Sequence, residues 1–356
     1  MSTSSCLVFT DSVADSLSQL LRSETSSGIF VVADTNTAPL IAQPLMSRCA
    51  PLSAARLITV EAGDDNKNLV QLSRIWEQLS ATGATRHSMI VNVGGGVVTD
   101  MGGFAAATFK RGVRCVNVPT TLLGAVDAAL GGKTAVNFAG LKNEIGVFAD
   151  PLAVIVDARY FSTLPHSELL SGYAELLKHS LLENASELRE ALDFNLSDPD
   201  FDMLQRLLER SIRVKQRIVT EDPHEHGIRR ALNLGHTAGH AFESLAMEKH
   251  SPVPHGYAVA WGLVVALVLS RMKLGLDSAV LHSVARFVAE NYPAPAALCS
   301  DYDRLIALMR HDKKNLSVSA INFTLLRTPG EPVINCEVPQ TDITAAIDIA
   351  RDLLGQ

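Results

Sequence analysis

The chain has 356 residues, of which 47% are hydrophobic and 19% are charged, so it can build sizeable cores and is not a disordered chain. Its formal net charge of -7 argues against general nucleic-acid binding, because a phosphate backbone requires a basic surface. The cysteines form no CxxC pair, which favours incidental thiols in a reducing compartment. The first residues lack the pattern of a signal peptide, and the longest apolar run, 258–269, is shorter than the roughly 18 residues of a membrane span. We therefore expect a cytoplasmic protein.

In the first part of the chain, short apolar runs rich in β-branched residues alternate with helical stretches. These runs predict strands at 29–33, 56–60, 88–93, 115–118 and 153–156. Strands that read as continuous apolar runs are typical of a parallel sheet covered by helices on both faces. The pattern predicts an α/β domain over residues 1–157.

After residue 157 the apolar residues recur at helical spacing. The predicted helices span 168–193, 201–220, 232–249, 256–274, 279–291 and about 340–354, and Pro165, Pro223, Pro254 and Pro293 lie near their ends. Two extended runs, 319–326 and 332–338, precede the last helix. We expect a second, mostly helical domain over residues 158–356.

Three glycines, Gly94, Gly95 and Gly96, follow the strand at 88–93 and precede an alanine-rich helical run. Glycine lets backbone N–H groups approach a phosphate, and a helix N-terminus favours negative charge. An ordinary tight turn explains the same glycines, and their spacing is not the Rossmann fingerprint GxGxxG. The loop therefore indicates a dinucleotide site, but of another kind.

Histidines and carboxylates in the helical part suggest a metal site. His236 and His240 are one turn apart on a predicted helix, His255 begins the next helix, and Glu175 and Lys178 are one turn apart on an earlier one. Two histidines and a carboxylate are a common ligand set for a catalytic zinc ion that keeps open positions. Histidines at this spacing are also frequent as surface or satisfied core residues.

Further polar clusters accompany these histidines. They are Arg229 with Asn233, Asp127 with Lys133, Lys142 with Asn143, and the pair Lys313 and Lys314. A density of polar groups around an apolar helix favours a functional site, whereas paired lysines by themselves usually form a solvated face.

Seven segments together resemble the dehydroquinate synthase family, in the order and with the separations of that family. They are GGGVVTDMGGFAAATFKRGV (94–113), VPTTLLGAVDAALGGKT (118–134), LKNEIGVF (141–148), GYAELLKH (172–179), RRALNLGHTAGHAFE (229–243), HGYAVAWG (255–262) and HDKKN (311–315). The resemblance implies an α/β N-terminal nucleotide-binding domain plus an all-α C-terminal domain, usually in a homodimer.

The resemblance also implies roles for individual residues. A divalent metal, zinc or cobalt, would be held by Glu175, His236 and His255, with His240 beside it. The NAD site would be lined by Gly94, Gly95, Gly96, Asp100, Thr120, Thr121 and Thr163, with Asp34, Asn36, Asp64 and Lys67 near the adenosine end. The substrate would meet Asp127, Lys133, Lys142, Asn143, Lys178, Lys215, Arg229, Asn233, His240 and one or both of Lys313 and Lys314. Arg111 would reach the substrate phosphate across the dimer interface.

The implied reaction belongs to the shikimate pathway of aromatic amino acid biosynthesis. A carbon–oxygen lyase of this family converts the sugar phosphate 3-deoxy-D-arabino-heptulosonate 7-phosphate into 3-dehydroquinate and phosphate by transient oxidation with NAD, β-elimination, reduction and aldol closure. Anionic ends on the substrate require lysines and arginines, which the motifs supply. His240, Lys133 and Asn143 are the candidates for proton handling and oxyanion contacts.

Three departures from the family pattern leave these groups intact: Tyr257 replaces a glutamate, Leu141 a glycine and Asp64 a glutamate. Two other enzymes remain alternatives. One is a sugar phosphate cyclase acting on a substrate without a carboxylate, which Lys215, Arg229 and Asn233 disfavour. The other is a metal-dependent polyol dehydrogenase, which would release NADH. A non-catalytic binding protein is a third reading, which an intact set of metal ligands argues against.

Overall fold

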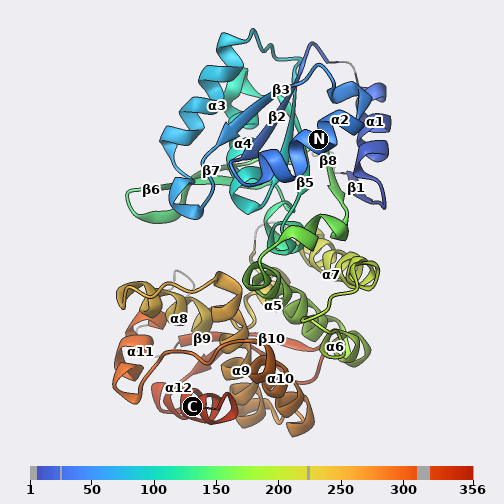
Figure 1. Ribbon diagram of the computed structural model, residues 1–356. Coiled ribbons are helices and arrows are strands. Elements are labelled where there is room, and N and C mark those ends of the chain that lie inside the picture. The colour runs from blue at the N-terminus through green and yellow to red at the C-terminus, as the bar shows by residue number, and fades with distance from the viewer. Residues whose placement is uncertain (1–5, 25, 223–224, 311–320, 356) are drawn as a thin grey trace. The chain divides into compact units, whose positions relative to one another are not determined.

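The structure is a computed structural model that describes residues 6–24, 26–222, 225–310 and 321–355. The chain forms two compact units (Figure 1). The first contains Met1–Leu164 with Phe201–Glu209, and the second contains Pro165–Asp200 with Arg210–Gln356. Lys313 and Lys314 lie outside the described residues.

A six-stranded parallel sheet forms the centre of the first unit, in the order β1-β8-β5-β4-β2-β3. The strands are β1 (Cys6–Phe9), β2 (Ile29–Asp34), β3 (Arg56–Val60), β4 (Met89–Gly94), β5 (Arg114–Pro119) and β8 (Ala153–Val156). All five predicted strands are present in a parallel sheet, as expected. The edge strand β1 is an addition that its four residues did not signal.

Helices cover both faces of this sheet, because alternate residues of each strand point to opposite sides. On one face, Val31 and Val91 pack with Leu17 of α1 (Val13–Ser23) and with α2 (Gln43–Arg48). On the other face, Ile90 packs with Leu72 of α3 (Leu69–Ala81) and with α4 (Gly96–Thr108). Each fully buried side chain of this size stabilises the fold by about 1.5–3 kcal/mol.

The rest of the first unit consists of short elements around the sheet. These are η1 (Ala38–Ala42), η2 (Ala50–Leu52), η3 (Asp64–Asn66), η4 (Phe109–Arg111), η5 (Gly124–Ala128), η6 (Ala158–Thr163) and an antiparallel hairpin of β6 (Lys133–Phe138) and β7 (Leu141–Phe148). The sequence did not predict this hairpin, because seven of the eight residues of β7 are exposed and its apolar residues do not alternate regularly.

The second unit is mainly helical. Its helices are α5 (His166–Glu183), α6 (Ala185–Leu192), α7 (Phe201–Glu221, whose first nine residues belong to the other unit), η7 (Ile228–Asn233), α8 (His236–Glu248), α9 (His255–Leu274), α10 (Ser278–Asn291), η8 (Cys299–Asp301), α11 (Tyr302–Arg310) and α12 (Gln340–Leu353). The two late extended runs form an antiparallel pair, β9 (Ile321–Leu326) and β10 (Pro332–Val338).

Two predicted helices differ from the structure at their ends. The predicted helix 168–193 is divided at Asn184, whose side chain accepts the N–H groups of Ser186 and Glu187 and so begins α6. The predicted helix 232–249 begins only at His236. The residues before it form η7, and Gly235, with a φ of 78°, separates the two.

Helix α9 lies at the centre of the second unit. By length and composition it could cross a membrane, but 72% of its most apolar 18-residue stretch is buried inside the protein. Its residues are apolar on all sides, which is typical of a core helix surrounded by other elements. Helices α5, α8, α10 and α12 and strand β9 all contact α9.

Candidate functional site

Glu175, His236 and His255 converge in the second unit. The Nε2 atom of His236 lies 3.2 Å from Oε1 of Glu175, and Nε2 of His255 lies 3.7 Å from the same oxygen. One ligand atom from each residue lies within 4.8 Å of the other two. Glu175 is 1% exposed, so its carboxylate is withdrawn from water. A carboxylate and two imidazoles at this spacing form a donor set that fits Zn²⁺ or Co²⁺.

Close helix packing holds these three residues together. His236 and His255 are the first residues of α8 and α9. Helix α9 packs against both α5 and α8, and glycines allow these close contacts. At Gly256 a Cβ would lie 1.9 Å from the carbonyl oxygen of Ser171 on α5. At Gly235 the positive φ and the nearby Leu263 both require glycine. The sequence therefore needs glycine at both positions to bring α8 and α9 to the carboxylate.

The charges in this cluster favour the metal-binding forms of Glu175 and His236. Burial raises the pKa of Glu175, but the Lys178 ammonium and His236 outweigh burial and hold that pKa well below its usual range. Burial and the Lys178 cation lower the pKa of His236 to about 4. Glu175 is therefore ionised and His236 neutral at physiological pH.

The pKa of His255 is shifted in the opposite direction to that of His236. Burial lowers its pKa, but hydrogen bonds with the carboxylates of Glu175 and Glu243 outweigh burial and raise the pKa to about 10. Its Nδ1 lies 3.0 Å from Oε2 of Glu243, and Nδ1 of His236 lies 3.1 Å from the carbonyl oxygen of Leu234. Each histidine thus has its Nδ1 engaged outside the cluster and its Nε2 on the side of Glu175, so that Nε2 is the atom available to a metal, as is usual for metal-binding histidines.

Glu243 was not among the residues predicted from the sequence. It lies seven residues after His236 on α8, so helical spacing places the two on one face, and that spacing was a usable signal. His240 lies on the same face between them. Its ring centroid is 5.3 Å from that of His236 and 5.9 Å from that of His255. The structure therefore places His240 beside the three converging side chains.

The other predicted residues of the second unit lie on the neighbouring elements. Lys178 pairs with the second carboxylate oxygen of Glu175, and Lys215 of α7 is buried. Arg229 and Asn233 belong to η7, the turn that leads into α8. The backbone N–H of Arg229 donates to the Asp222 carboxylate over 3.1 Å. A buried ammonium and a buried guanidinium on one unit are suited to an anionic ligand.

Strands β9 and β10 are hydrogen-bonded to η7. The Thr324 hydroxyl donates to the carbonyl oxygen of Arg230 over 2.9 Å, and the Arg230 guanidinium donates to Oδ1 of Asn335 over 2.9 Å. The side chain of Asn233 donates to Glu225 over 3.1 Å. The hairpin thereby fixes the backbone that carries Arg229.

The glycine loop of the first unit connects the end of β4 to α4, with Gly95 as the N-cap. A Cβ on Gly94 would lie 2.5 Å from Val98, and one on Gly95 would lie 2.7 Å from Thr121, so the loop packs too closely for side chains. The Thr120 hydroxyl at the end of β5 is buried without a hydrogen-bond partner in the described part of the chain. N–H groups at a helix N-terminus and a buried hydroxyl without a protein partner fit a pyrophosphate.

Strand β2 ends at the same edge of the sheet. The Asp34 carboxylate accepts the N–H groups of Asn36 and Thr37 over 2.9 and 2.7 Å, and the Thr37 hydroxyl donates to the carbonyl oxygen of Val93 on β4. Parallel strands present their carboxyl ends at one edge, where open α/β sheets bind ligands. Asp34 and Asn36 therefore lie at the edge that carries the glycines.

Five of the remaining predicted residues of the first unit are joined by direct contacts, and four others lie on separate short elements or at the start of β6. The Lys67 ammonium contacts the Asp100 carboxylate and, at 2.5 Å, Oδ1 of Asn143, and Lys142 pairs with Asp64 at 3.5 Å. Asp127 belongs to η5, Lys133 begins β6, Thr163 ends η6, and Arg111 ends η4 with a φ of 67°. Lys67 therefore joins Asp100, predicted for the cofactor, to Asn143, predicted for the substrate.

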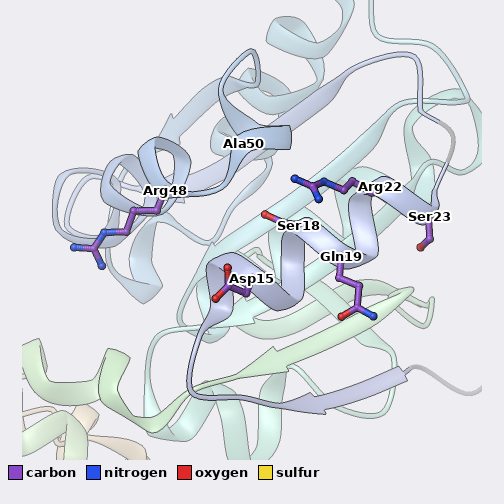
Figure 2. Close-up of a pocket in the computed structure, with 7 residues that line it drawn as sticks. All are labelled: Asp15, Ser18, Gln19, Arg22, Ser23, Arg48 and Ala50. Carbon is purple, nitrogen blue, oxygen red and sulfur yellow. The ribbon is translucent and has the colours of Figure 1, made fainter.

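A separate depression of about 510 Å³ lies at the surface of the first unit, between α1 and the segment after α2 (Figure 2). Its lining residues are Asp15, Ser18, Gln19, Arg22, Ser23, Arg48 and Ala50. None of them belongs to the predicted site, and the two arginines are exposed. We assign no function to this depression.

Comparison with known proteins defines the class of protein first. The structure matches that of a 2-deoxy-scyllo-inosose synthase complexed with carbaglucose-6-phosphate, NAD+ and Co2+, with a TM-score of 0.84 and 25% identity, covering 98% of this chain and 99% of that one. It also matches a 2-epi-5-epi-valiolone synthase from Streptomyces hygroscopicus with NAD+ and Zn2+ bound, with a TM-score of 0.85 and 24% identity, covering 99% and 98%. The fold is the dehydroquinate synthase-like fold of these cyclases.

The sequence comparisons then identify the family. Residues 57–171 match the family model for the 3-dehydroquinate synthase N-terminal region, and residues 172–315 match the model for its C-terminal region. The 3-dehydroquinate synthase of Parabacteroides distasonis is 46% identical over 339 residues, which cover 95% of this chain and 96% of that protein. The chain belongs to the 3-dehydroquinate synthase family, and this confirms the resemblance seen in the seven sequence segments.

Proposed function

We propose that this protein catalyses the 3-dehydroquinate synthase reaction, the conversion of 3-deoxy-D-arabino-heptulosonate 7-phosphate into 3-dehydroquinate and phosphate in the shikimate pathway. The observation that carries the proposal is the convergence of Glu175, His236 and His255 in a chain whose residues 57–315 match the models of this family. Loss of phosphate from a carbon atom makes the enzyme a carbon–oxygen lyase.

Glu175, His236 and His255 are the proposed metal ligands. Bound there, a divalent zinc or cobalt ion acts as a Lewis acid that lowers the pKa of coordinated hydroxyl groups. The donor set supports this assignment, since three protein ligands leave positions for substrate. Lys178 balances the Glu175 charge, and Glu243 orients His255. His240, beside the ligands but without a place among them, is proposed to handle protons.

The glycine loop is the proposed NAD site. Bound NAD supplies a reversible hydride acceptor, so the net oxidation of the reaction is zero. The N–H groups at the start of α4, with Thr120 and Thr121, are proposed to hold the pyrophosphate. The proposed contacts at the adenosine end are with Asp34, Asn36, Asp64 and Lys67, and Asp100 and Thr163 are proposed to line the NAD site with the glycines.

The substrate has a carboxylate and a phosphate, and the proposed substrate residues are largely cationic. Arg229 is suited to a carboxylate, because a guanidinium makes two parallel hydrogen bonds to it. Buried Lys215 adds a second charge on the same unit. The other proposed substrate residues are Asp127, Lys133, Lys142, Asn143, Lys178, Asn233, Lys313, Lys314 and, from a partner subunit in a homodimer, Arg111. We propose a soluble, cytoplasmic enzyme with a small-molecule substrate and no nucleic-acid or membrane partner.

The decisive experiment incubates the metal-loaded protein with NAD⁺ and 3-deoxy-D-arabino-heptulosonate 7-phosphate and follows phosphate release, product identity and NADH together. Equal amounts of phosphate and 3-dehydroquinate without net NADH support the proposal. Turnover of sedoheptulose 7-phosphate or glucose 6-phosphate instead would indicate another sugar phosphate cyclase. Net NADH from a simple polyol would indicate a dehydrogenase.

A further inference from the structure

The hairpin of β6 and β7 has little apolar burial of its own. It lies outside the six-stranded sheet, and an isolated two-stranded hairpin is at best marginally stable in water. Its base is attached to α4, where a Cβ on Gly103 would lie 2.6 Å from Thr134 and where Val136 joins the core. The far end of the hairpin, which carries Lys142 and Asn143, therefore needs another attachment.

Pairing in the hairpin is irregular at this far end. Val136 is opposite Ile145 and Phe138 is opposite Leu141, so the segment 142–144 faces the single residue Asn137. Asn143 lies within this bulge with a φ of 54°, in the left-handed region that few residues other than glycine and asparagine adopt. A bulge also leaves backbone groups without a partner in the ladder.

The Asn137 side chain supplies that partner. Its Oδ1 accepts the backbone N–H of Asn143 over 2.9 Å, in place of a bond from the ladder. Its Nδ2 donates to the carbonyl oxygen of Asp64 over 3.0 Å, and its own backbone N–H donates to the carbonyl oxygen of Lys67 over 2.7 Å. One half-buried asparagine thus holds both the bulge and the loop at 64–67.

Lys67 makes a second connection between the loop at 64–67 and the bulge. Its side chain is 5% exposed, and its ammonium contacts both the Asp100 carboxylate of α4 and Oδ1 of Asn143. The side chain of Asn143 is therefore held by Lys67, and its backbone is held by Asn137. Each contact places a residue proposed for substrate relative to residues proposed for NAD.

We propose that Asn137 is a positioning residue that sets the cofactor loop (Asp64 and Lys67) and the substrate bulge (Lys142 and Asn143) in one fixed relation. The inference rests on the proposed function for the roles of these four residues. Asn137 itself touches neither ligand in this account. It acts through its acceptor, which holds the bulge, and through its donor, which holds the loop.

Two substitutions distinguish the acceptor role of the Asn137 side chain from its donor role. Asn137→Ala removes both side-chain bonds, so the Kd for NAD and the KM for the sugar phosphate should each rise roughly tenfold, with a smaller change in kcat. Asn137→Asp keeps the acceptor for Asn143 and loses the donor to Asp64. It should weaken NAD binding by a similar factor and leave the KM for the sugar phosphate within about twofold of the parent protein.

The test measures NAD affinity by calorimetry, KM and kcat by phosphate release, and hydrogen exchange of the segment 139–148 by mass spectrometry. Faster exchange in Asn137→Ala than in Asn137→Asp is expected, because only the aspartate retains the bond to the Asn143 amide. The control is Asn195→Ala, which removes a similar loop hydrogen bond to the Ser197 N–H in the second unit and should change neither affinity.

Unchanged NAD affinity and KM in Asn137→Ala would overturn the inference, as would identical effects of the two substitutions. Failure of the proposed function gives a different result. In that case the parent protein releases no phosphate, while NAD affinity and hydrogen exchange still decide whether Asn137 holds the loop and the bulge.

Discussion

The Glu243 carboxylate lies 3.0 Å from Nδ1 of His255, on the side of the imidazole opposite to Glu175. His255 is therefore held between two carboxylates, one on α5 and one on α8. A metal that replaces the Nε2 proton of His255 would find the imidazole held in a fixed direction by the hydrogen bond from Nδ1 to the carboxylate. This relationship makes Glu243 the outer partner of a proposed metal ligand.

Replacement of Glu243 should weaken metal binding without removing a ligand. We expect Glu243→Ala to raise the Kd for Zn²⁺ or Co²⁺ roughly 10–100-fold, measured by competition with a chromophoric chelator. Glu243→Gln should have a smaller effect, because its amide oxygen can still accept the Nδ1 proton. Glu248→Gln is the matched control on the same helix, since Glu248 is exposed and pairs with Arg304. Equal affinities of the Ala variant and the control would contradict the orienting role.

His236 and His240 should differ in kind, although both lie on one face of α8. His236→Ala removes a proposed ligand, so the purified protein should hold less than about a tenth of the parent's metal under the same chelator. His240→Ala should keep its metal and lose about 10²–10⁴-fold in kcat, the range for a group that handles protons. Metal content by mass spectrometry and phosphate release decide both. Loss of metal in His240→Ala would show that the ligand set is wrong.

Much of the fold follows from local pattern. The five predicted strands agree with the structure within one residue at each end, because buried parallel strands are continuous apolar runs bounded by polar turns. The hairpin β6–β7 was missed, since β7 is mostly exposed and bulged at Asn143. The break at Asn184 was missed because apolar residues continue at helical spacing on both sides.

The candidate site, like the fold, was predictable from the sequence only in part. Helical spacing alone placed Lys178 one turn from Glu175, and the structure shows their contact. No local pattern could bring α5 to His236 and His255, since that depends on close packing at Gly235 and Gly256. The residue types suggested a metal site, but only the resemblance to a family selected Glu175, His236 and His255 as its three ligands in advance. Asn137 was missed because its role depends on the register of a hairpin that was not predicted.

Substitution of Arg229 tests whether this residue binds the substrate carboxylate. Arg229→Ala should raise the KM for 3-deoxy-D-arabino-heptulosonate 7-phosphate and lower kcat/KM by about 10- to 10²-fold, because loss of a charged hydrogen bond costs about 1.5–3 kcal/mol and leaves the carboxylate unpaired. Arg229→Lys should recover only part of this loss, since an ammonium cannot make the bidentate contact. Arg213→Ala, on α7, serves as the comparison. Normal turnover of Arg229→Ala would remove Arg229 from the substrate site.

Gly256→Ala tests the packing that brings His255 to the site. A Cβ there would lie 1.9 Å from the Ser171 carbonyl oxygen, so α9 must shift away from α5, at a cost of about 2 kcal/mol or more. Gly275→Ala is the control, because Gly275 has a φ of 75° but open space around it, which limits the cost to about 1–2 kcal/mol of backbone strain. Both variants should unfold at lower temperature than the parent protein by calorimetry. Only Gly256→Ala should also lose affinity for Zn²⁺, because the shift moves His255 away from Glu175. Full metal affinity in that variant would show that the α5–α9 contact does not position the ligand.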